Sequence, residues 1–237
     1  MRSDRVTVVI PTYNERENLP LIAEAVLAHG YRLIIVDDDS PDGTGELADM
    51  LSLDLDGMNV IHREEKAGLG PAYAHAFSIA LETDATCIVQ MDADFSHDPE
   101  AIPSLVQGVD EGADLVIGSR YVEGGSMPDW PLARRLISRG GNLYAGVMLG
   151  LKVRDATAGF RAWRADRLRD LAFEGAQASG YGFQVEMAWK AQRAGLEIAE
   201  VPIVFRDRTR GTSKMNGRIV AEAMLLVTRW GVGRLRR

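Results

Sequence analysis

The first half of the chain alternates short runs of β-branched and apolar residues with longer segments of helical periodicity, and this alternation constrains the fold more than any other feature. The pattern predicts strands over residues 6–10, 33–37, 59–62, 87–91 and 114–117, and helices over 17–29, 43–52, 69–83 and 99–110. Strand followed by helix, repeated several times, is typical of a mostly parallel sheet with helices on both faces. The sequence therefore predicts an α/β fold.

The rhythm changes after residue 118, where a loop rich in glycine and proline follows. The remaining predicted elements are helices over 132–149, 181–194 and 217–230 and a strand over 200–205. A chain of 237 residues, 46% of them hydrophobic, can bury one substantial core but is short for two large domains. We expect one globular catalytic domain over residues 1–216, followed by a basic amphipathic helix over 217–237.

Polar clusters follow four of the predicted strands. They are Pro11–Glu15, Asp37–Gly43, Asp92–Asp94 and Gly118–Tyr121. In an open α/β sheet, ligands bind beyond the carboxyl ends of the strands, because the connecting loops converge there. These four clusters are therefore the first candidates for a binding site.

Asp92 and Asp94 leave a buried-looking strand two residues apart, at an edge where at least one carboxylate can reach a hard cation. Carboxylate oxygens suit Mg²⁺ or Mn²⁺, which keep several waters and bind substrate phosphates. Aspartates are also common in solvated turns. The pair alone leaves both interpretations open.

The adjacent carboxylates Asp37, Asp38 and Asp39 repel one another and require solvent, capping or pairing. The following residues predict a turn and a helix start, with Ser40 or Asp42 as the cap. This interpretation leaves Asp37 and Asp38 available to accept hydrogen bonds from a base or a ribose.

Charge is unevenly distributed along the chain. The net charge is −7, yet residues 206–237 hold nine Arg or Lys against two acidic residues, so the rest of the chain carries −14. Arg206, Arg208, Arg210 and Lys214 surround the small residues 211–213 in a loop that could fold over a diphosphate or could simply be solvated. The acidic remainder argues against nucleic acid as a partner.

Several classes of site are excluded. The chain has no phosphate loop of the Gly-x-x-x-x-Gly-Lys type, and the glycines at 68 and 70 fail the spacing and context of a dinucleotide fingerprint. The four histidines are scattered, which favours surface positions over a metal cluster. The single cysteine, Cys87, needs no oxidising compartment, and the N-terminus lacks an apolar signal segment, so a cytoplasmic location is expected.

Taken together and in order, these clusters resemble the family-2 glycosyltransferases of the GT-A nucleotide-binding fold, and within them the polyprenol-phosphate (dolichol-phosphate) mannose synthases. The motifs that carry the resemblance are Ile10–Glu15, Val36–Thr44, Asp92–Asp94, Gly118–Tyr121, Thr157–Arg161 and Arg208–Lys214. Each motif is weak alone, and six in sequence over nearly the whole chain are specific.

The resemblance implies roles for individual residues. The nucleoside pocket would be lined by Pro11, Tyr13, Glu15, Val36 and Asp38, and the ribose and diphosphate would lie at Asp92, Ala93 and Asp94. Asp94 would be the principal metal ligand, assisted by Ser96. Many relatives carry Gln at the position of Ser96, two residues after Asp94. Arg120, Arg208 and Lys214 would hold phosphates and, with Asp94, carry catalysis. Arg120, Arg134 and Ser138 would receive the acceptor phosphate.

The reaction implied is inverting, metal-dependent transfer of mannose from GDP-mannose to a polyprenyl monophosphate, with Mg²⁺ or Mn²⁺ as cofactor. Transfer of another sugar from a UDP donor, or a non-catalytic module that binds nucleotide sugars, are the alternatives. A lipid acceptor implies a membrane surface as partner, with the protein peripheral on its cytoplasmic face and with room for a separate membrane-anchoring protein.

The final predicted helix fits that surface. Its apolar residues Ile219, Val220, Ala223, Met224 and Val227 share one helical face, and arginines flank it. This pattern is typical of a helix in a membrane interface, attracted by anionic lipid. A closing helix packed on the core would show the same apolar face.

Overall fold

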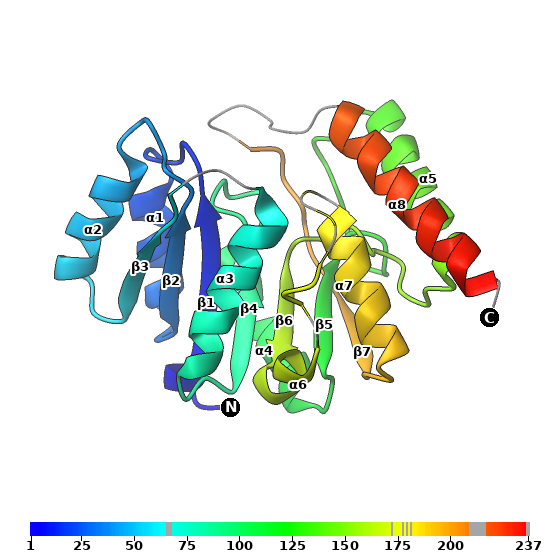
Figure 1. Cartoon of the computed structure of the whole chain (residues 1–237). Coiled ribbons are helices and arrows are strands. Elements are labelled where there is room, and N and C mark those ends of the chain that lie inside the picture. Colours follow the sequence, from blue (N-terminus) through cyan, green and yellow to red (C-terminus); the bar gives the residue numbers. More distant parts are fainter. Residues whose placement is uncertain are drawn as a thin grey trace.

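The computed structural model describes residues 1–64, 68–171, 173–176, 178, 180, 182–208 and 217–235. A seven-stranded sheet in the order β3-β2-β1-β4-β6-β5-β7 runs through the molecule (Figure 1). The strands are β1 Val6–Thr12, β2 Arg32–Asp37, β3 Met58–His62, β4 Cys87–Gln90, β5 Leu115–Ser119, β6 Arg161–Arg164 and β7 Ile198–Pro202. All neighbouring strands are parallel except β6, which is antiparallel to both β4 and β5. The predicted mostly parallel α/β sheet is confirmed.

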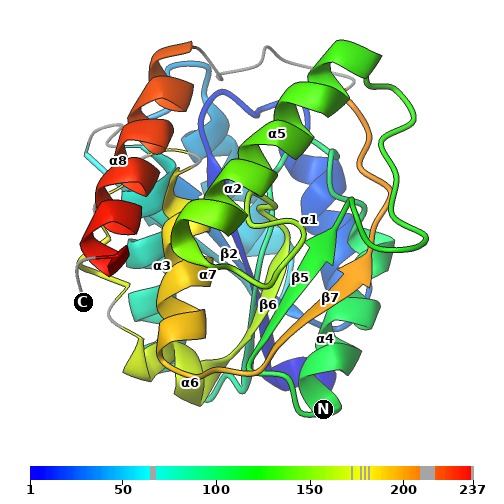
Figure 2. The ribbon, with the colours of Figure 1, turned by 90° about the vertical axis from the view of Figure 1, so that its right-hand side faces the viewer.

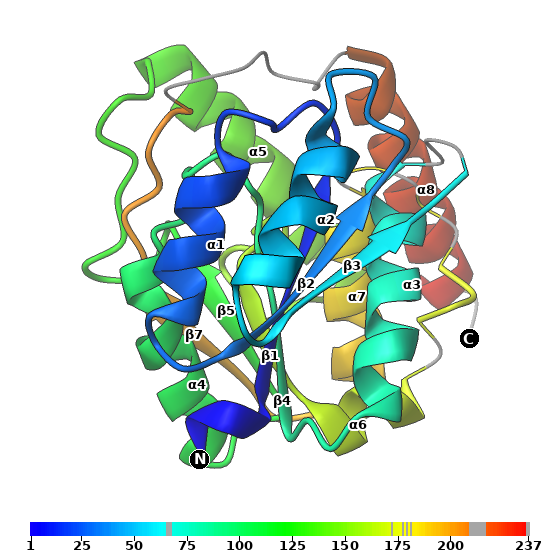
Figure 3. The same ribbon diagram turned by 90° about the vertical axis from the view of Figure 1, so that its left-hand side faces the viewer.

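Helices cover both faces of the sheet. They are α1 Leu19–Leu27, α2 Thr44–Asp54, α3 Leu69–Glu82, α4 Ile102–Asp110, α5 Leu132–Leu149, α6 Ala165–Asp170, α7 Gly182–Arg193 and α8 Gly217–Leu235, with short 3-10 turns η1 Ser3–Arg5 and η2 Pro99–Ala101. One apolar core joins α1, α2 and α4 to one face, and a second joins α3, α6 and α7 to the other (Figure 3). Alternate residues of each buried strand supply the two cores, as the two-residue period of a strand requires.

Most predicted elements begin and end within two residues of the observed ones. Helix α1 starts two residues later than predicted, after a turn over Glu15–Asn18, and Gly30 follows it at φ 74°, where a glycine is expected to end a helix. The last strand is displaced: β7 ends at Pro202, whereas the sequence predicts a strand to residue 205. Strand β6 and helix α6 were not predicted at all.

Helices α5 and α8 lie side by side at one end of the molecule and pack on α7 (Figures 1 and 2). Ala145, Leu149 and Val227 are buried between them, and the rings of Trp189 and Trp230 stack at 5.6 Å. Val227 therefore belongs to the core rather than to an exposed face, which corrects part of the expectation for the last helix; Met224 on the same helix is exposed. The side chains of Ile219 and Val220 lie outside the described residues.

Candidate active site

The predicted polar clusters converge at one edge of the sheet because β2, β1 and β4 are parallel neighbours. Pro11 pairs in register with Val36, so the nucleoside-pocket residues of the first two clusters stand side by side. The charge of Glu15 contributes to raising the pKa of the Asp92 carboxyl, after burial as the main cause, so the first and third clusters are close in space. Tyr13 lies in the same loop as Glu15 and is partly buried.

Two of the three adjacent aspartates, Asp37 and Asp38, are compensated within the protein, and Asp39 is exposed. Asp37 accepts hydrogen bonds from the backbone N–H (2.9 Å) and hydroxyl (2.6 Å) of Ser40 and from Thr12 (2.9 Å). Asp38 forms a buried ion pair with Arg63 at 2.6 Å. The expectation that Asp37 and Asp38 are available for a base or ribose is therefore wrong for Asp37, which closes the turn, and Asp38 would have to share its carboxylate with Arg63.

The buried side chain of His97 fixes the backbone of Asp92 through a hydrogen bond. The backbone N–H of Asp92 donates to Nδ1 of His97 (3.1 Å), and the imidazole stacks on Phe160 at 5.0 Å. Burial lowers the pKa of His97, so the ring is neutral with its proton on Nε2. His97 is 2% exposed, so the predicted surface position is wrong for this histidine, because its packing depends on residues distant in sequence.

Asp94 carries its negative charge in a buried position. Burial alone would raise the pKa of its carboxyl, but hydrogen bonds from Ser96 and the positive charge of Arg208 hold that pKa below its usual value. The backbone N–H of Ser96 donates to Oδ1 of Asp94 at 3.0 Å, and Nη2 of Arg208 lies 3.1 Å from Oδ2. The structure thus places Ser96 as a hydrogen-bond donor to the predicted metal ligand.

A single short segment after β7 makes three contacts with two parts of the site. The backbone N–H of Arg206 donates to the carbonyl of Ser96 (3.3 Å), Asp207 pairs with Arg134 of α5 (2.8 Å), and Arg208 pairs with Asp94. The segment therefore connects the acidic loop after β4 with the helix predicted to receive the acceptor. Lys214, which the sequence predicts to hold phosphate, lies outside the described residues.

Helix α5 turns its polar face toward this segment. Besides Arg134, it presents Ser138, which accepts a hydrogen bond from the hydroxyl of Tyr121 at 2.6 Å. The guanidinium of Arg134 also lies 4.0 Å from the ring centroid of Trp130. Arg134 and Ser138 thus lie one helical turn apart on α5, next to the loop that follows β5.

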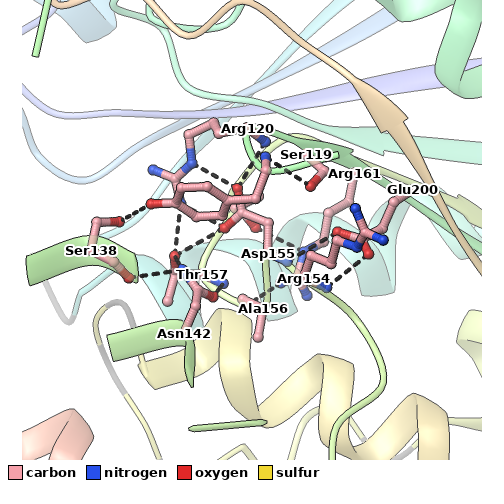
Figure 4. Close-up of polar contacts among 12 residues, drawn as sticks. Ser119, Arg120, Ser138, Asn142, Arg154, Asp155, Ala156, Thr157, Arg161 and Glu200 are labelled. Atoms are coloured by element: carbon pink, nitrogen blue, oxygen red, sulfur yellow. Dashed lines mark hydrogen bonds and ion pairs between the residues drawn. The ribbon is translucent and has the colours of Figure 1, made fainter. Parts of the chain in front are cut away.

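Arg120 is enclosed rather than presented to solvent (Figure 4). Its Nε and Nη2 donate to Asp155, both at 2.7 Å, and Nη2 also donates to Thr157 at 2.7 Å. Burial would raise the pKa of Asp155, but the hydrogen bonds and charge of Arg120 lower it. The loop carrying Asp155 is fixed in turn by Glu200 of β7, which accepts from the backbone N–H of Asp155 (3.0 Å). Arg120 therefore joins the loop that follows β5 to the loop that precedes β6.

The acidic pair fits a divalent metal of the kind that binds substrate phosphates. Such a metal needs only one or two protein carboxylates, since waters and phosphate oxygens complete its shell. Asp92 and Asp94 supply that number, and Asp94 already neutralises a cationic group, Arg208. Among the described residues no group of three or more His, Cys, Asp or Glu gathers into a closed metal cage.

A family model, "Glycosyl transferase family 2", matches residues 7–171 of the chain. This stretch spans more than half of the sequence and contains the acidic loop, Arg120 and Asp155. The chain belongs to glycosyl transferase family 2. As a family-2 glycosyltransferase it is an enzyme, and the predicted family membership is confirmed.

Curated relatives cover almost the whole of this glycosyltransferase. It is 47% identical over 99% of its length to polyprenol monophosphomannose synthase of Mycolicibacterium smegmatis, covering 90% of that protein. It is 49% identical over 96% of its length to undecaprenyl-phosphate mannosyltransferase of Micrococcus luteus, covering 94% of that protein. Its relatives are thus polyprenyl-phosphate mannose synthases.

Solved structures confirm the GT-A fold. Glucosyl-3-phosphoglycerate synthase of Mycobacterium tuberculosis, crystallised with Mn²⁺, UDP and glucosyl-3-phosphoglycerate, superposes with a TM-score of 0.68 at 21% identity, over 98% of this chain and 80% of that chain. A mannosyltransferase of Pyrobaculum calidifontis in complex with GDP-Man and Mn²⁺ gives 0.55 at 17% identity, over 100% and 75%. At these identities the likeness establishes the fold.

Proposed function

We propose that this glycosyltransferase transfers mannose from GDP-mannose to a polyprenyl monophosphate, with inversion at the anomeric carbon and with Mg²⁺ or Mn²⁺. The observation that carries the proposal is the segment Arg206–Arg208, which joins the carboxylate pair to the acceptor face of α5. The names of two relatives at 47% and 49% identity support mannose as the sugar and a polyprenyl phosphate as the acceptor.

The donor diphosphate would lie between the acidic loop and Arg208. Asp94, with Asp92 beside it, would hold the metal, which supplies positive charge against the diphosphate. Arg208 stands next to Asp94 and would share the negative charge that builds on the departing nucleoside diphosphate, with Lys214 as a second proposed cation. Pro11, Tyr13, Glu15, Val36 and Asp38 would line the nucleoside pocket.

The acceptor phosphate would lie on the inner face of α5. Ser138 accepts from Tyr121, so its own hydroxyl proton remains to be donated to a phosphate oxygen, and Arg134 would share its charge between Asp207 and the phosphate. Arg120, neutralised by Asp155, would shape this subsite rather than add net charge. A phosphate monoester is already ionised at neutral pH, so its oxygen can attack the anomeric carbon without a strong general base.

A lipid acceptor also requires a surface that meets the membrane, and the outer face of α5 provides one. At about 100° per residue, Leu132, Leu136, Leu143 and Val147 fall on the side of the helix opposite Arg134 and Ser138. These four apolar side chains are between 60% and 71% exposed. Helix α8 lies beside α5 (Figure 2), and it adds the exposed apolar side chains of Met224, Leu225 and Val232. We call these seven residues the α5–α8 apolar face.

We place this α5–α8 apolar face in the interface of the cytoplasmic leaflet, with the acceptor phosphate reaching inward past α5. Arg139 and Arg229 on the same two helices would be attracted by anionic lipid. No helix in the described part of the chain is long and apolar enough to span a bilayer. The single cysteine, Cys87, is free and buried, in keeping with a reducing compartment.

Liposome flotation tests the surface assignment. Wild type is expected to float with anionic vesicles at low salt, and Leu143→Ser with Val147→Ser is expected to remain in the unbound fraction. Leu53→Ser removes an apolar side chain that is 87% exposed on α2 and should float normally. Flotation that requires added native membranes would instead indicate an anchoring protein, and equal flotation of all three proteins would contradict the assignment.

Purified protein with labelled nucleotide sugar, a polyprenyl phosphate and Mg²⁺ or Mn²⁺ tests the reaction itself. GDP-mannose is expected to give polyprenyl phosphate mannose of inverted configuration and to outperform UDP-glucose and other donors. Chelation should stop the transfer. Preference for a UDP donor, or product formed equally well with excess chelator, would overturn the donor or the metal assignment respectively.

A further inference from the structure

A chain of buried side-chain amides runs behind the acidic loop, and its direction is fixed by an indole. Nε1 of Trp163 donates to Oε1 of Gln90 at 2.9 Å. Because an indole N–H can only donate, Gln90 must present its oxygen there and its NH₂ group on the other side. That NH₂ group donates to the carbonyl of Gly159 (3.1 Å) and to Oε1 of Gln184 (2.9 Å). The NH₂ group of Gln184 is therefore turned away from Gln90.

This second NH₂ group has no hydrogen-bond partner among the residues that the structure describes. Gln184 stands in the first turn of α7 and is only 1% exposed. A buried donor left without a partner loses its bond to water without replacement, and native proteins rarely leave one unmatched. Something other than the described protein atoms is expected to accept from it.

The position of Gly159 shows where this NH₂ group lies relative to the site. A Cβ atom added at Gly159 would lie 3.7 Å from Nε2 of Gln184, 3.7 Å from Oδ2 of Asp92 and 3.4 Å from Cε1 of His97. The bare face of Gly159 is thus bordered by an amide donor and a carboxylate acceptor. Gly159 and Asp92 are both partly exposed, so the place opens toward the carboxyl ends of the strands.

The chemistry of this border selects a hydroxyl group. A hydroxyl can accept from the amide of Gln184 and donate to the carboxylate of Asp92 at the same time. A phosphate oxygen only accepts, so it could use the amide of Gln184 but could not donate to Asp92. The proposed nucleoside residues lie at the ends of β1 and β2, whereas Gly159 precedes β6 on the opposite side of β4. The hydroxyl therefore belongs to the part of the donor farthest from the base, which is the sugar.

We infer that Gln184, together with Asp92 and the bare face of Gly159, binds a hydroxyl of the transferred sugar. The inference rests on the proposed function, because it takes a nucleotide sugar as the donor. It assigns to Gln184 the selection of the sugar, separate from the binding of the nucleoside diphosphate. Each deoxy position of the sugar can then be tested against this one side chain.

Gln184→Met removes the amide at nearly constant size, while Gln90 keeps its bond to the carbonyl of Gly159. Wild type and variant are compared by calorimetric binding of GDP and GDP-mannose, and by kcat/KM with a series of monodeoxy-mannose donors. GDP should bind both proteins equally. GDP-mannose should bind the variant about five- to tenfold more weakly, as expected for one lost hydrogen bond. One deoxy donor should be penalised in wild type and not in the variant.

Gln192→Met, on the same helix but bonded to Gly150 and Lys152, is the matched control and should discriminate among deoxy donors as wild type does. Gly159→Ala is the second variant: its methyl group makes only ordinary contacts and needs no unusual backbone angle, but it fills the proposed hydroxyl position. It should reduce GDP-mannose affinity toward that of GDP alone.

If Gln184→Met discriminates among the deoxy donors as fully as wild type does, the inference is overturned. This holds even if the variant is less stable than wild type, because the amide of Gln184 would then bind a buried water and not the sugar. The proposed donor is judged separately, on wild type alone. If wild type binds a different nucleotide sugar, the donor assignment falls, and the same comparison made with that sugar still decides the role of Gln184.

Discussion

Two arginine–aspartate pairs of the site, Arg120–Asp155 and Arg208–Asp94, differ in how completely they are enclosed. Arg120 and Asp155 are 7% and 0% exposed and share two hydrogen bonds of 2.7 Å, whereas Arg208 is 25% exposed and reaches Asp94 through one contact of 3.1 Å. A buried pair with several hydrogen bonds fixes the loops that it joins. A partly exposed pair with one contact can be exchanged for a ligand at small cost. One pair therefore serves architecture and the other chemistry.

The largest effect is expected from Asp155→Asn, which leaves the charge of Arg120 buried without its counter-charge. Breaking one side of a buried pair typically costs about 3–5 kcal/mol. Urea denaturation at neutral pH measures the loss. Asp166→Asn breaks the exposed pair with Arg164 and should cost under about 1 kcal/mol. Equal losses for the two variants would erase the distinction between the pairs.

Asp94→Ala should act on turnover and not on folding. We expect transfer to fall by about 10²–10³-fold or more, as when one preorganised electrostatic group is removed. The free energy of unfolding should stay close to that of wild type, because Arg208 can turn to solvent. Steady-state rates and urea denaturation on the same preparation decide the matter. Near-wild-type transfer by the variant in excess chelator would show that this carboxylate has no part in the reaction.

Arg208→Ala is expected to increase the affinity for metal in the absence of nucleotide, which is a smaller effect than the loss of turnover in Asp94→Ala and a gain rather than a loss. The guanidinium occupies the carboxylate proposed to bind metal, so its removal should raise the affinity for Mn²⁺ alone by up to about fivefold, since partly exposed pairs contribute about 1 kcal/mol. Electron paramagnetic resonance of free Mn²⁺ measures this directly. Arg206→Ala removes an exposed charge that touches Ser96 only through its backbone and should leave the affinity unchanged.

The smallest effect is a dependence on pH. The pKa of Asp155 is lowered in the folded chain, so its ionisation stabilises the fold above the ordinary carboxyl pKa of about 4, and this stabilisation is lost as the pH falls toward the lowered value. The difference in unfolding free energy between wild type and Asp155→Asn should therefore narrow below about pH 4. The pKa of Asp94 is lowered as well, so the corresponding difference for Asp94→Asn should narrow in the same direction but by less, because its partner Arg208 is partly exposed.

The parallel half of the fold could be predicted because its information is local. Each strand end is marked by a polar cluster, and parallel pairing alone brings Pro11, Val36 and Asp92 to one edge. Strand β6 could not be found in this way. It is four residues long, two of its residues are arginines, and it is held by pairing with residues of β4 and β5 that lie 44 or more positions earlier in the chain.

The site residues that the sequence analysis did not name share one property: each is a polar side chain buried in the fold. His97, Asp155 and Gln184 are polar letters in the sequence, and nothing local distinguishes them from surface residues. Asp155 does stand two residues before the Thr157–Arg161 motif, and this position was the available signal. The proposed metal pair and the proposed acceptor residues Arg134 and Ser138 could be named from the sequence, because their residue types alone suggest phosphate chemistry.

The segment Arg206–Arg208 connects the two proposed substrate sites through one short stretch of backbone. Two neighbouring side chains of this segment form ion pairs with different parts of the site: Asp207 pairs with Arg134 of α5, and Arg208 pairs with Asp94 of the acidic loop. A diphosphate that draws Arg208 away from Asp94 would therefore also displace Asp207 and weaken its ion pair with Arg134. Arg134 would then be released for the acceptor phosphate, so the two proposed substrates are expected to favour each other's binding.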